Sequence, residues 1–291
     1  MERRQLAYFL AVAEHEGLGG AATALGVAQP TISQALRSLE RELGVPLFLR
    51  VGRGMVLSAA GRSLVGPARK ILRDITSVRD LLGATGGRLT GRLDITAFPA
   101  LAAQVSPLVA EFRAAYPNVV VGFGELADES SAPALIRDGH SEFVVAHVPI
   151  GDPTLEVIEL GSQEYWLAYP FGTELPEGPV PLAQLPDLPM VFVPQGHSVA
   201  DEIHDAIRAA GVRLRNAVLV DHREARIPMV LAGIGGSIVE RSLAEAVADR
   251  AVVRPADPPI TRAFALAFDP GTLSPVGQAF AALALDRATA G

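Results

Sequence analysis

A short run near the N-terminus carries side chains that can hydrogen-bond to base edges and phosphates. At about 100° per residue, Ile32 and Leu36 form one apolar side of a predicted helix. The opposite side carries the polar set Pro30, Gln34, Arg37 and Arg41, flanked by Ser33 and Ser38. Amide, hydroxyl and guanidinium groups are the ones that helices use in the major groove. The spacing therefore predicts a helix that reads double-stranded DNA.

The preceding residues are suited to holding this helix at a fixed angle. Residues 21–25 predict a short helix with a small apolar face, and Gly26 can take the left-handed conformation that ends it. Residues 1–13 predict a first helix whose apolar face is Leu6, Phe9, Leu10 and Ala13. Residues 44–61 then predict two short strands, with Arg50 and Arg53 in the turn between them. Residues 21–40 alone also fit an ordinary helical hairpin with a solvated polar face.

This pattern resembles the LysR-type transcriptional regulators. The matching residues are Leu6 to Phe9, the A-x-x-L-x-V-x-Q-P-x-I-S run from Ala22 to Ser33, Leu36, Leu39-Glu40, Leu43-Gly44, Leu47-Phe48, Arg50, Gly54, Leu57 and Ala60-Gly61. The resemblance implies a winged helix-turn-helix that binds double-stranded DNA. The implied DNA-binding residues are Gln29, Pro30, Thr31, Ser33, Gln34, Arg37, Arg41, Arg50 and Arg53.

Two positions depart from the family pattern. Ala28 stands where the family usually has Ser, so the recognition helix lacks a side chain that would cap its N-terminus, a loss of about 1 kcal/mol. Gly19 and Gly20 stand in the preceding helix where polar helix formers are usual, and each costs a helix about 1 kcal/mol relative to Ala. We therefore expect a second helix that is less rigid than in a typical member.

Charge is divided unevenly along the 291 residues. The chain carries −7 overall, but residues 1–89 hold 12 Lys and Arg against 7 Asp and Glu, so only the N-terminal part is basic. The chain has no cysteine, which excludes disulfides and thiolate metal sites. Because the sequence shows neither a signal peptide nor a long apolar run, we expect a cytoplasmic protein without membrane contact.

Residues 58–82 predict one long amphipathic helix, with Pro67 inside it as a candidate bend. Its apolar stripe is Leu64, Ala68, Ile71, Leu72, Ile75, Val78 and Leu82. Because a small N-terminal domain offers no partner for so long a stripe, we expect it to pack on a second copy of the chain. The alternative is a helix that folds back on its own body. The family resemblance implies a linker-helix dimer, and the residues GATGG at 83–87 mark a boundary.

The remaining residues alternate predicted strands and helices, which favours parallel sheets covered on both faces. We expect strands at 91–98, 118–126, 142–148, 164–170, 189–194, 217–222, 236–240 and 263–268, and helices at 106–117, 132–139, 199–210, 224–233, 241–249 and 274–285. This part resembles the effector-binding domain of the same family, itself similar to periplasmic solute-binding proteins. The matching residues are Gly91, Leu93, Phe112, Tyr116-Pro117, Val119, Leu135, Gly139, Ala232 to Gly235, Leu273 to Pro275 and Phe280.

The predicted fold class is thus α/β with an N-terminal winged helix-turn-helix, a linker helix and a two-lobed effector domain. We expect the DNA-binding domain at residues 1–58, the linker helix and hinge at 59–88, the first lobe at 89–163 plus 269–291, and the second lobe at 164–268. The resemblance implies that a small-molecule effector binds in the cleft between the lobes and changes DNA binding or transcription. It implies a dimer or tetramer, and RNA polymerase is a further candidate partner.

Three segments face the ligand in such domains. The implied effector-binding residues are Phe98, Pro99, Ala100, Leu101, Ser130, Ser131, Pro194, Gln195, Gly196, His197, Ser198 and His222. Backbone N–H groups at a helix start suit a carboxylate. However, Ala100 stands where a Ser or Thr hydroxyl commonly holds an anionic ligand. Glu240 stands where the family usually has Pro, and the sequence assigns it no role.

Other classes of function find less support in the sequence. A hydrolase using Ser198, His204 and Asp221 would need a strained nucleophile turn, and no G-x-S-x-G motif surrounds Ser198. A stand-alone solute receptor would be exported and would lack a DNA-reading domain. There is no H-E-x-x-H, P-loop or dinucleotide-binding motif, so we expect no metal, no cofactor and no enzymatic activity.

Overall fold

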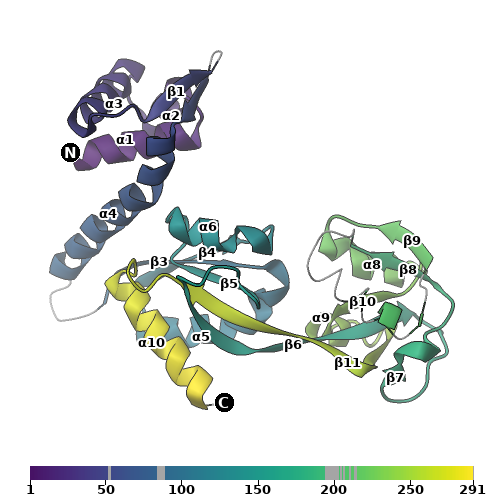
Figure 1. Ribbon diagram of the computed structural model, residues 1–291. Helices are drawn as coiled ribbons and strands as arrows, with labels where there is room; N and C mark the ends of the chain where they lie inside the picture. Colours follow the sequence, from purple (N-terminus) through teal and green to yellow (C-terminus); the bar gives the residue numbers. More distant parts are fainter. Residues whose placement is uncertain are drawn as a thin grey trace.

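A computed structural model describes residues 1–51, 54–83, 89–193, 203, 205, 207–209, 211–212 and 215–290. It consists of an N-terminal head, one long helix and an elongated two-lobed body to which the C-terminal helix returns (Figure 1). Among the residues described, no helix combines the length and apolarity needed to cross a membrane.

The head is a three-helix unit with a two-stranded wing, as the sequence predicts. Its elements are α1 (Arg3–Glu14), α2 (Leu18–Leu25), α3 (Gln29–Leu43), β1 (Phe48–Val51) and β2 (Gly54–Leu57). Leu6, Ile32 and Leu39 are fully buried between the helices, and the rings of Phe9 and Phe48 lie 5.5 Å apart. This apolar core holds α3 at a fixed angle to α2.

The start of α3 has the geometry that its sequence predicts. Gly26 ends α2 in the left-handed region at φ 64°, and Ala28 is the N-cap residue with no side-chain cap hydrogen bond. Arg50 differs slightly from expectation, because it lies within β1 opposite Met55 rather than in the turn. Arg53 lies outside the described residues.

The long helix α4 (Ala59–Gly83) packs within its own chain more than its sequence predicts. Val65 and Ala68 are buried in the core of the head, with Leu64, Ile71 and Leu72 packed against them. The expectation that the stripe lacks a partner in the head is therefore wrong for its first half, because α1 is apolar on a second side that covers α4. The side chains of Val78 and Leu82 lie outside the described residues, and a seam between two chains along the second half stays a prediction.

The body is built on one mixed sheet whose strand order is β10-β6-β11-β5-β3-β4, with β7 paired to β11. These strands are β3 (Gly91–Ala97), β4 (Val119–Glu125), β5 (Phe143–His147), β6 (Glu156–Pro170), β7 (Val180–Pro181), β10 (Ser237–Glu240) and β11 (Ala251–Phe268). A second sheet pairs β8 (Pro189–Phe192) with β9 (Arg215–Leu219). The helices are α5 (Ala102–Ala115), α6 (Ala132–Arg137), α8 (Arg226–Leu231), α9 (Arg241–Glu245) and α10 (Pro275–Ala290).

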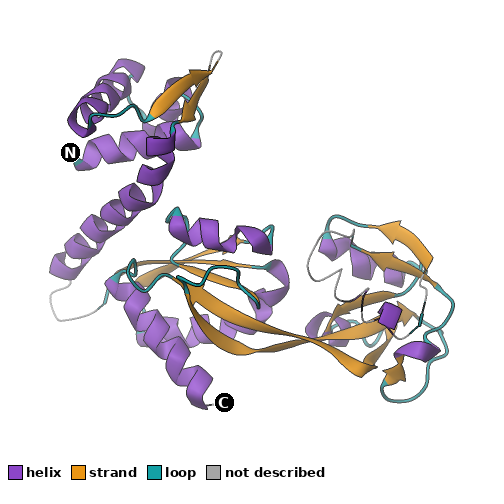
Figure 2. Ribbon diagram, in the orientation of Figure 1, coloured by secondary structure: helices purple, strands orange, loops and turns teal. Residues whose placement is uncertain are grey.

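Strands β6 and β11 join the two lobes, and the sequence did not predict their length. They pair antiparallel from one lobe into the other, as the two long crossing arrows of Figure 2 show. Pairs β3–β4, β3–β5 and β8–β9 are parallel as expected, whereas β5–β11 and β6–β10 are also antiparallel. Prolines and charged residues interrupt the apolar pattern of β11, and a bulge between Pro255 and Ile260 accommodates them.

Candidate functional site

The polar face of α3 and the wing form one concave surface in the head. Its volume is about 730 Å³, and it is lined by Leu18, Gln29, Pro30, Ser33, Gln34, Arg37, Arg41 and Arg50. Thr31 is exposed but does not line this surface. The fold therefore gathers seven of the nine predicted DNA-contacting residues, although Arg50 comes from a different element.

The cations of this surface are available to a ligand. Among the residues that the structure describes, no carboxylate lies within ion-pair distance of Arg37 or Arg50. Arg41 donates from Nε to the carbonyl oxygen of Arg37 at 3.3 Å, which leaves its other N–H groups available. An exposed cationic surface of this shape suits the phosphates and base edges of a duplex.

In the body, the first predicted effector segment lies at the start of α5. Residues Pro99–Leu101 form a 3-10 turn η1, and Leu101 is fully buried in the core. The carbonyl oxygen of Ala100 accepts a hydrogen bond from Nε2 of Gln163 at 2.6 Å, so a side chain of the crossing strand β6 occupies this position. Phe98 is buried, and its ring and that of His147 are T-shaped, with 5.6 Å between their centroids.

The second predicted segment forms the 3-10 turn η2 (Glu129–Ser131). Both of its hydroxyl groups bond within the turn: Ser130 Oγ donates to the carboxylate of Asp128 at 2.5 Å, and Ser131 Oγ donates to the backbone oxygen of Asp128 at 2.6 Å. The third predicted segment, Pro194 to Ser198, lies outside the described residues.

Glu129 is the first of two polar centres that the fold assembles between the lobes. One of its oxygens accepts from the backbone N–H of His147 at 2.8 Å and lies 2.7 Å from its Nδ1, and the other lies 3.3 Å from Arg262. Nε2 of His147 lies 3.0 Å from the amide oxygen of Gln163, to which the Tyr165 hydroxyl donates at 2.7 Å. Burial raises the pKa of Tyr165, and the charge of Glu240 raises it further.

The second polar centre surrounds Glu240, a residue without a role in the sequence analysis. Oε2 of Glu240 forms an ion pair with Arg226 at 2.7 Å, and both side chains are buried. Oε1 lies 3.7 Å from Nη1 of Arg223, too far for a hydrogen bond, and both of these buried atoms lack a hydrogen-bond partner. Burial lowers the pKa of Arg223, whose guanidinium lies 4.6 Å from the centre of the Phe98 ring.

His222, a predicted effector residue, and its neighbour Arg223 lie in different surroundings. His222 is exposed and precedes the turn η4 (Arg223–Ala225), whereas Arg223 reaches from the second lobe to Phe98 of the first. Sequence patterns alone cannot choose between two such adjacent residues. In a helical turn, a shift of one position changes the direction of the side chain by about 100°.

Several residues of these centres were missed at the level of sequence. Gln163 and Tyr165 lie two apart on β6 and so face the same side of the sheet, and His147 ends β5. The pattern that could have identified them is a polar residue at every second position of an otherwise apolar strand. For Gln163 the signal is hidden because the predicted strand begins only at residue 164.

The described residues give no support to the alternative functions, a hydrolase or a metal-binding protein. Ser198 and His204 of the proposed hydrolase triad lie outside the described residues, and Asp221 is exposed. Within the described part of the chain, no three His, Asp or Glu side chains are grouped as a metal ion would require.

Comparisons with known proteins agree with the head and body just described. The family description "Bacterial regulatory helix-turn-helix protein, lysR family" matches residues 3–62, and "LysR substrate binding domain" matches residues 86–289. The transcriptional regulator TcbR of Pseudomonas sp. strain P51 is 31% identical over 252 residues, 84% of each chain. A probable hydrogen peroxide-inducible genes activator of Streptomyces viridosporus is 28% identical over 277 residues, 92% of this chain and 88% of that one.

Solved structures extend the likeness over the whole chain. The LysR family regulator CbnR matches with a TM-score of 0.71 and 25% identity, over 99% of both chains, and its complex with target DNA matches with a TM-score of 0.60 and 26% identity, over 99% of this chain and 100% of that one. Full-length OxyR from Pseudomonas aeruginosa shares the fold with a TM-score of 0.72 at 22% identity, over 98% and 96% of the two chains. The chain belongs to the LysR family: it is an oligomeric, DNA-binding transcriptional regulator whose C-terminal domain binds a small-molecule effector.

Proposed function

We propose that the concave surface of the head binds an operator in the major groove, with Gln34 and Arg37 reading bases. The flanking phosphates would be contacted by Arg50 and by Arg53, which follows it by three positions in the sequence. The observation that supports this assignment is the concave surface, about 730 Å³ in volume, that α3 and the wing line together. On it, Arg37 and Arg50 have no carboxylate partner among the described residues. The remaining candidates, Gln29, Pro30, Thr31, Ser33 and Arg41, would contribute backbone and edge contacts.

Titration of the full-length protein against its own upstream DNA and a scrambled duplex tests this assignment. Arg37→Ala should cost about 1–3 kcal/mol of discrimination at one operator position, because a bidentate contact to a base is lost. Arg4→Ala, which removes the same charge from α1, serves as the control and should retain discrimination. Equal weakening of both duplexes by Arg37→Ala would place another face in the groove.

We further propose that the effector binds between the lobes, against Arg223 and Glu240. A buried N–H of Arg223 and a buried oxygen of Glu240 lack hydrogen bonds, and buried polar groups are rarely left so. A ligand group that both accepts and donates, seated beside the Phe98 ring, would satisfy both atoms. The predicted effector residues Phe98, Pro99, Ala100, Ser130, Ser131 and His222, with 194–198, would surround it; Leu101 is buried and would support them.

A thermal-shift screen of polar metabolites on the full-length protein would identify an effector, since a ligand at 100 times its dissociation constant adds about 2.7 kcal/mol of stability. Arg223→Gln should then weaken binding of that effector by about tenfold or more, because it removes a charged donor. Arg215→Gln removes an exposed arginine paired with Asp187 and is the matched control. Unchanged affinity in Arg223→Gln would move the effector site elsewhere.

We also propose that the chain acts in the cytoplasm as a dimer or tetramer joined through α4, and that it regulates rather than catalyses. Ile75 is half-buried and belongs to none of the three hydrophobic cores of the described chain, so its surface is available to a second copy. Ile75→Asp should therefore reduce the sedimenting mass, because a charge would be buried in the seam. An unchanged mass would place the contact between chains outside this helix.

A further inference from the structure

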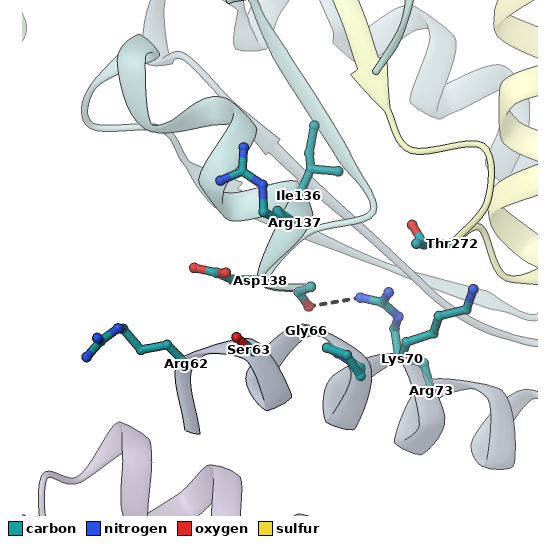
Figure 3. Close-up of a pocket in the computed structure, with 11 residues that line it drawn as sticks. Arg62, Ser63, Gly66, Lys70, Arg73, Ile136, Arg137, Asp138 and Thr272 are labelled. Atoms are coloured by element: carbon teal, nitrogen blue, oxygen red, sulfur yellow. Dashed lines mark hydrogen bonds between the residues drawn. The ribbon is translucent and has the colours of Figure 1, made fainter. Parts of the chain in front are cut away.

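A cavity of about 610 Å³ lies between α4 and the first lobe, on the side of α6 facing the head (Figure 3). This volume is in the range of small-ligand pockets. Its walls come from α4, from the end of α6 with the turn at Gly139, and from the loop before α10. The lining residues are Arg62, Ser63, Gly66, Pro67, Lys70, Arg73, Ile136, Arg137, Asp138, Gly139 and Thr272.

Three cations of this cavity have only neutral partners. Nη1 of Arg62 donates to the carbonyl of Leu57 at 3.0 Å, Nη1 of Arg73 to that of Gly139 at 2.9 Å, and Nζ of Lys70 to that of Gly271. Within the described chain, no carboxylate reaches ion-pair distance of these three side chains. Nε of Arg73 is buried without any hydrogen bond.

Neighbouring arginines differ from these three. Arg69 pairs with Glu14 at 3.0 Å, and Arg137 pairs with Asp152 at 2.8 Å. Figure 3 shows the guanidinium of Arg137 pointing away from α4, and Lys70 extending toward the loop of Thr272. Pairing is therefore normal around the cavity, whereas these three cations form no ion pair among the described residues: Asp138 is the one carboxylate in the lining, and the charge of Arg73 also acts on the buried Glu142.

The walls are held close enough to keep this arrangement. Nη1 of Arg69 donates to the carbonyl of Asp138 at 2.9 Å, beside the bond from Arg73 to Gly139, so two arginines of α4 hold the last carbonyls of the α6 turn. At Gly66, a Cβ would lie 2.2 Å from the carbonyl oxygen of Arg137, so the helix and the turn are in direct contact. The cavity thus has one wall on the helix that carries the head and another on the effector domain.

We propose that this cavity is a second regulatory site that binds an anion of two or more charges, through phosphate or carboxylate oxygens. Lys70 and Arg73 hold the anion against Thr272, and Arg62, at the other end of the cavity, adds to the positive potential there. A bound anion neutralises Lys70 and Arg73 and links α4 to the first lobe, so it favours one position of the head relative to the body. The site lies apart from the cleft around Arg223 and Glu240.

Calorimetric titration of the full-length protein with inorganic phosphate and with citrate, at constant ionic strength held with chloride, tests the proposal. One saturable site per chain is expected for at least one of the two probes, and the better probe identifies phosphate or polycarboxylate as the preferred chemistry. Lys70→Gln and Arg73→Gln should each weaken binding about tenfold or more, the loss typical of a charged hydrogen bond. Arg137 lines the same cavity, but its guanidinium is paired with Asp152. The variant Arg137→Gln should therefore bind the probes as wild type does.

Arg62→Gln alters an exposed side chain and gives a test that does not depend on the packing of Arg73; it should weaken binding as well. No saturable binding of either probe to wild type would overturn the proposal. Equal weakening by Arg137→Gln would reduce it to a general effect of charge and also overturn it. If Lys70→Gln lowered the sedimenting mass while wild type bound neither probe, an acidic side chain of a second copy would be the true partner.

Discussion

The head and the body differ in how the positive charges of their arginines are balanced. On the surface of α3, arginines are exposed and have no carboxylate partners among the described residues, whereas between the lobes arginines are buried against Glu129 and Glu240. A duplex supplies the counter-charge of the first surface when it binds, and water solvates that surface until then. A charge removed from water must be paired within the chain. The buried arginines of the body therefore have their counter-ions within the chain, whereas the exposed arginines of the α3 surface have none among the described residues.

The largest effect should come from breaking the buried pairing. Glu240→Leu leaves the buried Arg226 without its ion-pair partner and should lower the free energy of unfolding of the body by about 3–5 kcal/mol. Chemical unfolding followed by the fluorescence of Trp166, the single tryptophan, measures it. Asp187→Asn, which breaks an exposed pair with Arg215, should cost less than about 1 kcal/mol. Similar losses in both variants would mean that burial does not distinguish the two pairs.

The next effect should come from removing an unpaired charge of the head. Arg50→Ala leaves folding intact and should weaken binding to cognate and unrelated duplexes alike. The slope of log affinity against log salt concentration should fall by about 0.9, because one phosphate contact is lost. Mobility-shift titrations at several salt concentrations measure it. A loss confined to the cognate duplex would instead make Arg50 a base-reading residue.

The pH dependence of a buried carboxylate that forms no ion pair among the described residues extends this comparison. Glu142 accepts hydrogen bonds from the backbone N–H of Ser274 at 2.7 Å and from its hydroxyl at 3.2 Å, and burial raises its pKa. Because the folded chain holds this proton more tightly than the unfolded chain, the contribution of Glu142 to stability is greatest below the unfolded pKa near 4.5. It decreases as pH rises from there through the higher folded pKa.

As the pH rises on the acid side of neutrality, the melting temperature of Glu142→Gln should therefore decrease less than that of wild type. Differential scanning calorimetry at several pH values measures it. Parallel pH curves for the two proteins would show that Glu142 titrates with the same pKa in the folded and unfolded chains.

The smallest effect belongs to the start of α3. Ala28 caps the helix without a side-chain hydrogen bond, so Ala28→Ser should stabilise the head by about 1 kcal/mol. Thermal unfolding monitored by circular dichroism measures it, and Ala28→Gly, which adds no hydroxyl, is the control. An equal gain in both variants would trace the effect to the backbone rather than to the cap.

Much of the head could be predicted because its information is local. Helix α3 begins directly after Ala28, where its N-cap is expected, and its polar face follows from the spacing of Gln34, Arg37 and Arg41 alone. The body was predicted less well where strands change lobes. Strand β6 begins eight residues before the predicted strand at 164, since apolar and charged residues alternate there without the continuous run of a buried strand.

The sequence by itself determined the family, the order of the elements and the DNA-facing side of α3, because helical periodicity and turn residues act within a few positions of one another. Only the tertiary structure decided that Glu240 meets Arg226 and Arg223, that Gln163 reaches the carbonyl of Ala100, and that α4 lies against the turn at Gly139. Several of those contacts join residues more than 60 positions apart, and what selects them is the pairing of buried charges and backbone groups. That pairing is a property of the assembled fold.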